Sequence, residues 1–454
     1  MDDADNNLTH EVGGTSSEEV QSLLRHTHSP ISFQSSIVKF HSIASLSSLL
    51  DVEISKLSSI PEAIMTTFNS FVGPSVFALP FAFTTCGWAL SLIILLAIGA
   101  FTTFSMFVLI ECKNYCRPQN MKTLVGISKE CFGRYFSVLI ECLMVLSELC
   151  NCVACFMIST CTLESMAPTV IQQIFVLIVF IMLFLVLFIR SIRLISFMTV
   201  FSNILIICVI VLIIANILLV GSPASNHNPF LWNNLPFLLG VSLFSFEGAG
   251  LVLPIQNSMA RPSFFMSVLC FVLFLSFLLF CCFGLLTSLF LEIPIDEFVF
   301  VNSGSGTSYL RLSVCCLVAV IGFVELYLKL FAVSEAIEEY KCVRYVHKKS
   351  KAAYWIVILL LRVSLVSAAA IPSLTPFRRH FCYFISIAGC SVRGFILLVL
   401  PLLMHLRLGW RNIFWLRKMA EIIILSIASV VLCSSLVFVL KDAVVLLSME
   451  SQNG

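Results

Sequence analysis

The chain has 454 residues, of which 59% are hydrophobic and only 11% are charged, and its mean hydropathy is +1.02. Soluble domains carry roughly 25% charged residues, so this chain cannot form a polar shell, which excludes a water-soluble enzyme. The net charge of +2 without a basic block excludes nucleic-acid binding, and 19 cysteines scattered through apolar runs exclude a secreted disulfide framework. The composition therefore predicts a protein that crosses a lipid bilayer several times.

Residues 1–58 are polar and rich in serine, and we expect them to form a disordered cytosolic tail. Within this tail Glu19 precedes the pair Leu23 and Leu24. An acidic residue followed by two leucines resembles the sorting signals that adaptor proteins read for endosomal, lysosomal or vacuolar delivery. The alternative interpretation is an accidental leucine pair beside acidic residues.

Eleven apolar runs follow the tail, and each is long enough to span a membrane as a helix of about 20 residues. The runs are continuous rather than alternating, which favours helices over the strands of a β-barrel. They form a predicted transporter domain over 59–446 and cover residues 62–83, 87–110, 135–161, 171–189, 194–220, 235–256, 264–290, 308–337, 353–371, 381–406 and 419–446.

Basic residues set the orientation of these spans. The connections 111–134 and 339–352 carry five lysines or arginines each, whereas the connections 162–170 and 221–234 carry none. Because basic connections stay on the cytosolic side, the N-terminus is predicted to be cytosolic. An odd number of spans then leaves the short C-terminal segment 447–454 on the other side.

The first and sixth spans contain residues that interrupt a helix. Pro74 lacks an amide hydrogen, and Gly73 beside it gives the backbone freedom, so we expect the first span to unwind near 72–76. Gly248 and Gly250 weaken the sixth span in the same way. Interrupted helices five spans apart predict two inverted repeats of five helices, with one extra helix.

Such interruptions expose backbone amides and carbonyls that together suit a ligand carrying both an anion and an ammonium group. The predicted substrate site consists of residues at the two interruptions: Val72, Gly73, Ser75, Phe246, Gly248 and Gly250. The alternative is that these are packing kinks, since glycine and proline are common in membrane helices.

Three segments resemble the amino acid/auxin permease family, and in particular its proton-coupled and vacuolar amino acid transporter branch. They are 73–83 (GPSVFALPFAF), 246–259 (FEGAGLVLPIQNSM) and 334–338 (SEAIE). The resemblance implies an eleven-helix fold and amino acid transport. Departures from the family pattern are Ser75 and Ala78, where the family has glycine, and Val333, where it has proline.

Three carboxylates inside the predicted spans are candidates for proton coupling: Glu247, Glu148 and Glu325. A charge at the bilayer centre costs about 2.5–3.5 kcal/mol on insertion scales, so each invites a functional explanation. Structural alternatives remain for all three. Glu247 could cap free amides, Glu148 could contact an arginine (Arg362 or Arg393) and Glu325 could pair with Lys329 one helical turn away.

The sequence thus predicts a secondary active transporter of amino acids that works by alternating access, driven by H⁺ rather than Na⁺. Helix interruptions without arginine favour small neutral substrates. Besides the amino acid, the expected partners are the proton, the bilayer and adaptor proteins. We expect no cofactor, no metal and no catalytic site. A vacuolar or lysosomal membrane is favoured over the plasma membrane, and the alternative function is an amino-acid sensor that signals through its tail.

Overall fold

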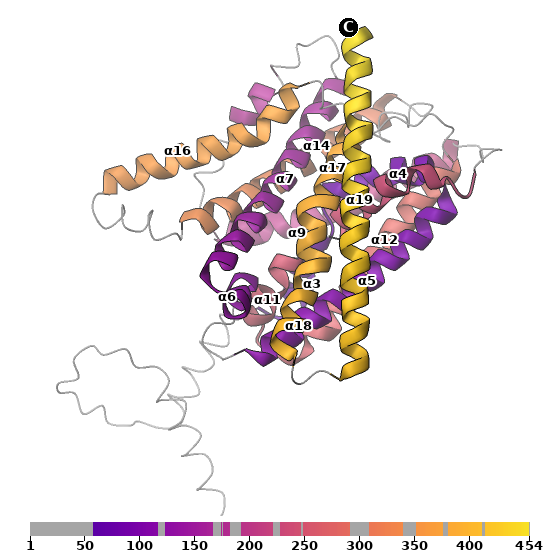
Figure 1. Ribbon diagram of the computed structural model, residues 1–454. Coiled ribbons are helices and arrows are strands. Elements are labelled where there is room, and N and C mark those ends of the chain that lie inside the picture. The colour runs from indigo at the N-terminus through magenta and orange to yellow at the C-terminus, as the bar shows by residue number, and fades with distance from the viewer. Residues whose placement is uncertain are drawn as a thin grey trace, which may run out of the picture. The chain divides into compact units, whose positions relative to one another are not determined.

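In the computed structural model (Figure 1), the described residues are 58–116, 123–166, 174, 176–181, 192–220, 228–246, 248–290, 308–338, 351–375, 380–410 and 414–453. Apart from one isolated β-bridge, this part of the chain consists of helices and their connections. The predicted tail, with Glu19, Leu23 and Leu24, lies outside the described residues.

The main helices are named as in Figure 1. In chain order they are α3 (Ile60–Phe71), α4 (Leu79–Cys86), α5 (Trp88–Tyr115), α6 (Leu124–Phe132), α7 (Arg134–Met166), α9 (Ile192–Val220), α10 (Leu235–Ser245), α11 (Ala249–Ser258), α12 (Phe265–Phe290), α14 (Ser308–Glu338), α16 (Lys351–Ala370), α17 (Phe381–Ala388), α18 (Leu400–Gly409) and α19 (Trp415–Asn453).

Nine helical segments among the described residues are long and apolar enough to cross a membrane, and they coincide with nine of the eleven predicted spans. The predicted first span is divided into α3 and α4, each too short to cross alone. The predicted fourth span, 171–189, lies largely outside the described residues. The chain is therefore an all-helical, multi-pass membrane protein.

Close helix crossings depend on small residues. The most extensive packing joins α14 to α7, where Gly322 lies against Ser159. Gly240 of α10 and Gly389 after α17 meet backbone to backbone, and any side chain at either position would collide with the neighbouring helix. Since lipid is as apolar as the helix surfaces, such close backbone packing is a main source of helix association in membranes.

The predicted tenth span is an irregular helix. Between α17 and α18 it widens into two π-helical stretches, Gly389–Arg393 and Phe395–Val399. The hydroxyl of Ser105 in α5 donates a hydrogen bond to the carbonyl of Leu397 within the second stretch. Widened turns of this kind are often found at functional sites.

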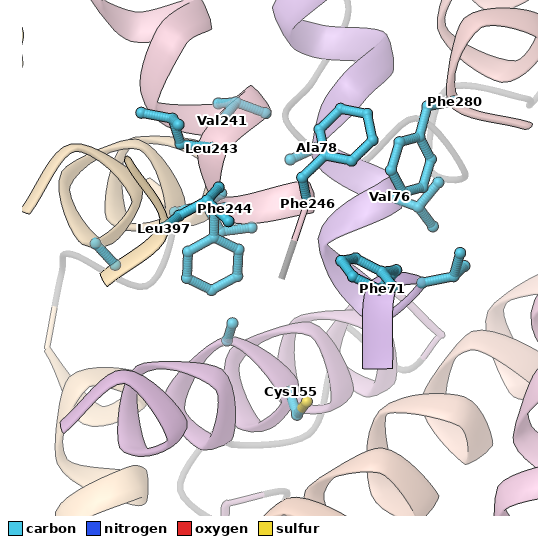
Figure 2. Packing of buried hydrophobic residues seen from close by; sticks show 14 of the residues in the cluster. Phe71, Val76, Ala78, Cys155, Val241, Leu243, Phe244, Phe246, Phe280 and Leu397 are labelled. Atoms are coloured by element: carbon cyan, nitrogen blue, oxygen red, sulfur yellow. The ribbon is translucent and has the colours of Figure 1, made fainter. Parts of the chain in front are cut away.

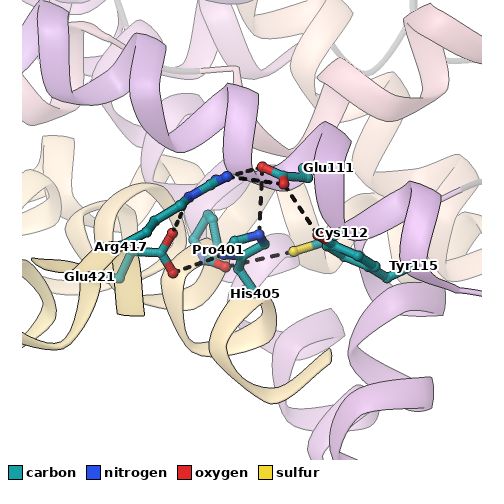
Figure 3. A network of polar contacts seen from close by, with 7 residues as sticks. All are labelled: Glu111, Cys112, Tyr115, Pro401, His405, Arg417 and Glu421. Carbon is teal, nitrogen blue, oxygen red and sulfur yellow. Dashed lines mark hydrogen bonds and ion pairs between the residues drawn. The ribbon is translucent and has the colours of Figure 1, made fainter. Parts of the chain in front are cut away.

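One polar network joins the ends of α5, α18 and α19 (Figure 3). The Arg417 guanidinium binds Glu111 at 2.5 Å and Glu421 at 3.0 Å. His405 Nδ1 lies 2.8 Å from Glu421 Oε2, and its Nε2 lies 3.5 Å from Glu111 Oε2. His405 and Glu421 are fully buried, so the network fastens α19 to the rest of the bundle.

Replacing Glu421 by Ala should destabilise this attachment, because it removes the carboxylate that both His405 and Arg417 contact. Leaving buried polar groups unpaired costs about 1–3 kcal/mol. We expect a lower melting temperature of the purified protein in detergent. Ser426→Ala is the matched control, because Ser426 is exposed and bonds only within α19. Equal melting temperatures for the two variants would contradict this role.

Candidate functional site

The first helix is interrupted where the sequence predicts it. α3 ends at Phe71, Val72 and Gly73 are extended, and a 3₁₀ turn over Pro74–Ala78 leads into α4. The amide of Val72 donates to the Phe68 carbonyl at 2.8 Å. Gly73 has φ −130° and ψ −169°, which other residues also adopt, so the expected need for glycine flexibility is wrong here. Instead, among the described residues other than its chain neighbours, no atom lies within 4 Å of the position that a Cβ would take, so Gly73 borders open space in this part of the structure.

The sixth helix is interrupted between α10 and α11. Phe246 donates its amide to the Ser242 carbonyl at 3.2 Å, and Gly248 has φ +130°. The amides of Leu251 and Val252 then donate to the Gly248 carbonyl and start α11. Here glycine is required, because a residue with a side chain rarely adopts this backbone conformation. The candidate Glu247 lies outside the described residues.

The two interruptions lie against each other. The ring carbons Cε1 and Cζ of Phe71 lie 2.8 Å from the position that a Cβ on Gly248 would take, so the ring packs directly on that glycine. Figure 2 shows Phe71 and Phe246 at the ends of the two interrupted helices, within a cluster of buried apolar side chains. Residues that are 177 positions apart thus meet at one place.

Backbone hydrogen bonds also join the two interrupted helices at both ends. Ahead of α3, Ser58 donates its amide to the Ser258 carbonyl at 2.8 Å and accepts from the Ala260 amide at 3.1 Å. At the other end, the Leu231 amide donates to the Cys86 carbonyl at 2.9 Å. The predicted first and sixth spans therefore run as a connected pair.

Lys113 of α5 adds a contact that the sequence analysis missed. Its ammonium group donates to Gln256 Oε1 at 2.8 Å and to Asn257 Oδ1 at 2.6 Å, at the end of α11. Gln256 and Asn257 belong to the family-like segment 246–259, and this contact gives them a structural role. By the predicted orientation, it lies on the cytosolic side.

A small cavity of about 40 Å³ borders the sixth-helix interruption. Three of the six predicted substrate-site residues line it, namely Phe246, Gly248 and Gly250. Among the described residues, Val72, Gly73 and Ser75 are not part of its wall. The rest of the wall comes from α7, from the two interrupted halves of helix six and from the widened tenth helix: Met144, Ser147, Glu148, Leu243, Leu251, Arg393, Ile396 and Leu397.

Arg393 reaches this cavity from the π-helical stretch. Its guanidinium donates to the carbonyls of Phe244 at 3.0 Å and Ser147 at 3.3 Å, and its central carbon lies 3.6 Å from the centroid of the Phe244 ring. A cation at the last carbonyls of α10 stabilises that helix end. The interrupted segments contain no arginine of their own, as the sequence shows, but Arg393 reaches the sixth-helix interruption from a distant segment.

Glu148 of α7 lies on the wall of the same cavity as Arg393, and one carboxylate oxygen accepts from the Asn151 amide group at 3.3 Å. The sequence analysis left open whether Glu148 serves proton coupling or contacts an arginine. The structure brings Glu148 and Arg393 to the wall of one cavity, and the role of Glu148 in proton coupling stays a prediction.

Glu325 belongs to a separate buried cluster beside the first interruption. Its Oε1 accepts hydrogen bonds from Asn69 at 2.8 Å and from Ser202 at 2.5 Å. Asn69 also donates to Asn203, which in turn donates to the α3 backbone. Glu325 is fully buried and Lys329, one turn along α14, is nearly so. The cluster therefore ties α3, just before its interruption, to α9 and α14.

No three His, Cys, Asp or Glu side chains gather to hold a metal ion within the part of the chain that the structure describes. Outside the spans, burial raises the pKa of Cys131 in α6 to about 12, so this thiol stays protonated at neutral pH and is a poor metal ligand. The candidate site consists of backbone groups, aromatic rings and a few charged side chains.

A helical membrane protein in which two interrupted helices lie against each other is typical of secondary transporters. Residues 56–444 match the family described as transmembrane amino acid transporter protein. The chain belongs to this family, which contains transporters and not enzymes.

Curated relatives have related names. The chain is 26% identical over 242 residues to vacuolar amino acid transporter 4 of Saccharomyces cerevisiae, covering 49% of this chain but only 33% of the yeast protein. It is 25% identical to amino acid transporter AVT3C of Arabidopsis thaliana, over 80% of this chain and 86% of that protein. It is 26% identical to the proton-coupled amino acid transporter-like protein pathetic of Drosophila melanogaster, over 43% of this chain and 41% of that protein.

The two glycines at the sixth-helix interruption, Gly248 and Gly250, should respond differently to substitution. Gly248→Ala places a residue with a side chain in a backbone conformation that favours glycine, which costs about 1–3 kcal/mol. The added methyl group would also collide with the Phe71 ring. Among the described residues, a Cβ on Gly250 meets only the flexible end of Met144. We expect Gly248→Ala to abolish uptake or folding and Gly250→Ala to retain both, as measured by size-exclusion chromatography and uptake into proteoliposomes. Normal uptake by the Gly248 variant would contradict this assignment.

Proposed function

We propose that the chain is a secondary active transporter that moves small neutral amino acids by alternating access, coupled to protons. The observation that carries the proposal is the contact between the two helix interruptions at Phe71 and Gly248. Interrupted helices leave backbone groups that bind the carboxylate and ammonium groups of a zwitterion. Membership of the amino acid transporter family supports the same substrate class.

The proposed architecture has eleven membrane helices over 59–446, arranged as two inverted repeats of five helices each, followed by one extra helix. The tail over 1–58 would be cytosolic, and the end over 447–454 would be non-cytosolic. Interruptions in the first and sixth helices support this repeat. The substrate site would then lie between Val72, Gly73 and Ser75 on one side and Phe246, Gly248 and Gly250 on the other.

For proton coupling we propose Glu325 and Glu148, together with Glu247 at the interruption itself. As a carboxylate, Glu325 accepts charge-assisted hydrogen bonds from Asn69 and Ser202. Protonation removes that charge and weakens both bonds. Loading a proton would thus loosen α3 next to its interruption, and releasing it would fasten α3 again. The word "proton-coupled" in the Drosophila relative's name supports this ion over sodium.

Uptake into proteoliposomes tests this function. Wild-type protein should concentrate a small neutral amino acid when the entry side is acidified, and an inward sodium gradient should not replace the proton gradient. Glu325→Gln keeps the shape and removes the titrating group. It should lower accumulation under a proton gradient to the level seen without one, while exchange of internal for external substrate continues.

Glu141→Gln is the matched control, because Glu141 lies on α7 two turns before Glu148 and away from both interruptions in sequence. It should keep the response to the proton gradient. If Glu325→Gln still concentrates substrate, coupling moves to Glu148 or Glu247, whose Gln variants are tested in the same assay. A wild-type response to sodium alone would contradict proton coupling.

We also propose a vacuolar or lysosomal membrane as the location, supported by the name of the yeast relative. Adaptor proteins would read Glu19, Leu23 and Leu24. Replacing both leucines by alanine should redirect a fluorescent fusion protein to the plasma membrane, as seen by microscopy. An unchanged location would argue against this signal. A protein that binds amino acids without carrying them across would favour the alternative, a sensor that signals through its tail.

A further inference from the structure

The Phe71 ring lies in the space between the two interruptions. Phe71 is the last residue of α3 and is 1% exposed. Its ring packs on Gly248, and Gly248 is also part of the cavity wall. Phe71 is not itself part of that wall, so its ring lies on Gly248 outside the cavity. It lies next to the backbone of the sixth-helix interruption, which the proposed function assigns to the substrate.

The cavity whose wall includes Gly248 is small. A cavity of about 40 Å³ holds about three water molecules, whereas ligand pockets usually measure about 300–1,000 Å³. Phe246 bounds the cavity, and its own ring is held in place by edge-to-face contact with Phe280 at 5.3 Å between centroids. Of these rings, the one that covers the Gly248 backbone is Phe71.

We propose that Phe71 is a specificity-determining residue that limits the size of the transported amino acid. This inference rests on the proposed function, because it takes the two interruptions as the substrate site. An amino acid whose charged groups bind both interruptions must lie across the gap between them. Its side chain then has only the volume that the Phe71 ring leaves, so small side chains fit and large ones collide with the ring.

Phe83 provides a matched control. It is fully buried, and its ring packs on Gly284 of α12 with ring carbons 2.6–2.9 Å from the position of a Cβ on that glycine. The contact therefore has the same geometry as that of Phe71 on Gly248. It joins α4 to α12, away from the second interruption. Phe83→Ala should thus cost similar packing without enlarging the substrate site.

The experiment compares uptake of glycine, alanine, leucine and phenylalanine by proteoliposomes containing each variant. Wild type should favour glycine and alanine. Phe71→Ala should raise the ratio of leucine to glycine uptake by at least about tenfold, the discrimination expected from a few methylene groups in an apolar pocket. Phe83→Ala should leave this ratio unchanged. Phe71→Leu should give a smaller increase, and Phe71→Trp should lower alanine uptake relative to glycine.

Thermal stabilisation of the purified proteins by the same four amino acids gives a second measurement, which does not require transport. An unchanged size profile in both Phe71→Leu and Phe71→Ala, with active wild type, would overturn the inference and leave the proposed function standing. A wild type that prefers leucine or phenylalanine would overturn the inference together with the proposed preference for small side chains, while amino acid transport itself would stand. A wild type that neither carries nor is stabilised by any amino acid would overturn both.

Discussion

The absence of water in the bilayer core is the constraint on which this structure depends, because every interrupted helix must satisfy its backbone groups within the protein. At the first interruption, the Val72 amide still reaches the Phe68 carbonyl. At the sixth, Arg393 supplies donors to the Phe244 carbonyl, and Gly248 accepts the amides that start α11. Burial of both interruptions against each other follows from the same requirement.

Two of the charged side chains inside the bundle lie beside these interruptions. Glu325 binds α3 just before it ends, and Arg393 binds α10 just before it ends. Glu325 joins the interrupted helix α3 to the uninterrupted helices α9 and α14. Arg393 joins the interrupted helix α10 to the uninterrupted helix α7. Under the proposed function, a change in the charge of Glu325 would act directly on α3 and would link proton binding to helix movement.

Much of the fold follows from local sequence. Hydropathy locates nine of the spans, and Gly73, Pro74 and Gly248 mark the two interruptions, since these signals act within a few residues. The resemblance of three short segments to a transporter family is confirmed over residues 56–444. The proposed proton-coupling residues stay predictions, and Glu247 lies outside the described residues.

What the sequence could not reveal depends on contacts between distant residues. Arg393 is 149 positions from Phe244, and no local pattern indicates that a widened helix aims it at the sixth-helix interruption. Phe71 is an ordinary apolar residue until Gly248 is placed beneath its ring. The open space beside Gly73 is likewise a property of its neighbours and not of its own backbone angles.

The most direct test is a cryo-electron microscopy structure of the protein with an amino acid that it transports. The account predicts that the carboxylate and ammonium groups contact the backbone at 72–75 and 246–250, with the Phe71 ring against the substrate side chain. An amino acid bound elsewhere, with the contact between Phe71 and Gly248 unchanged, would contradict it.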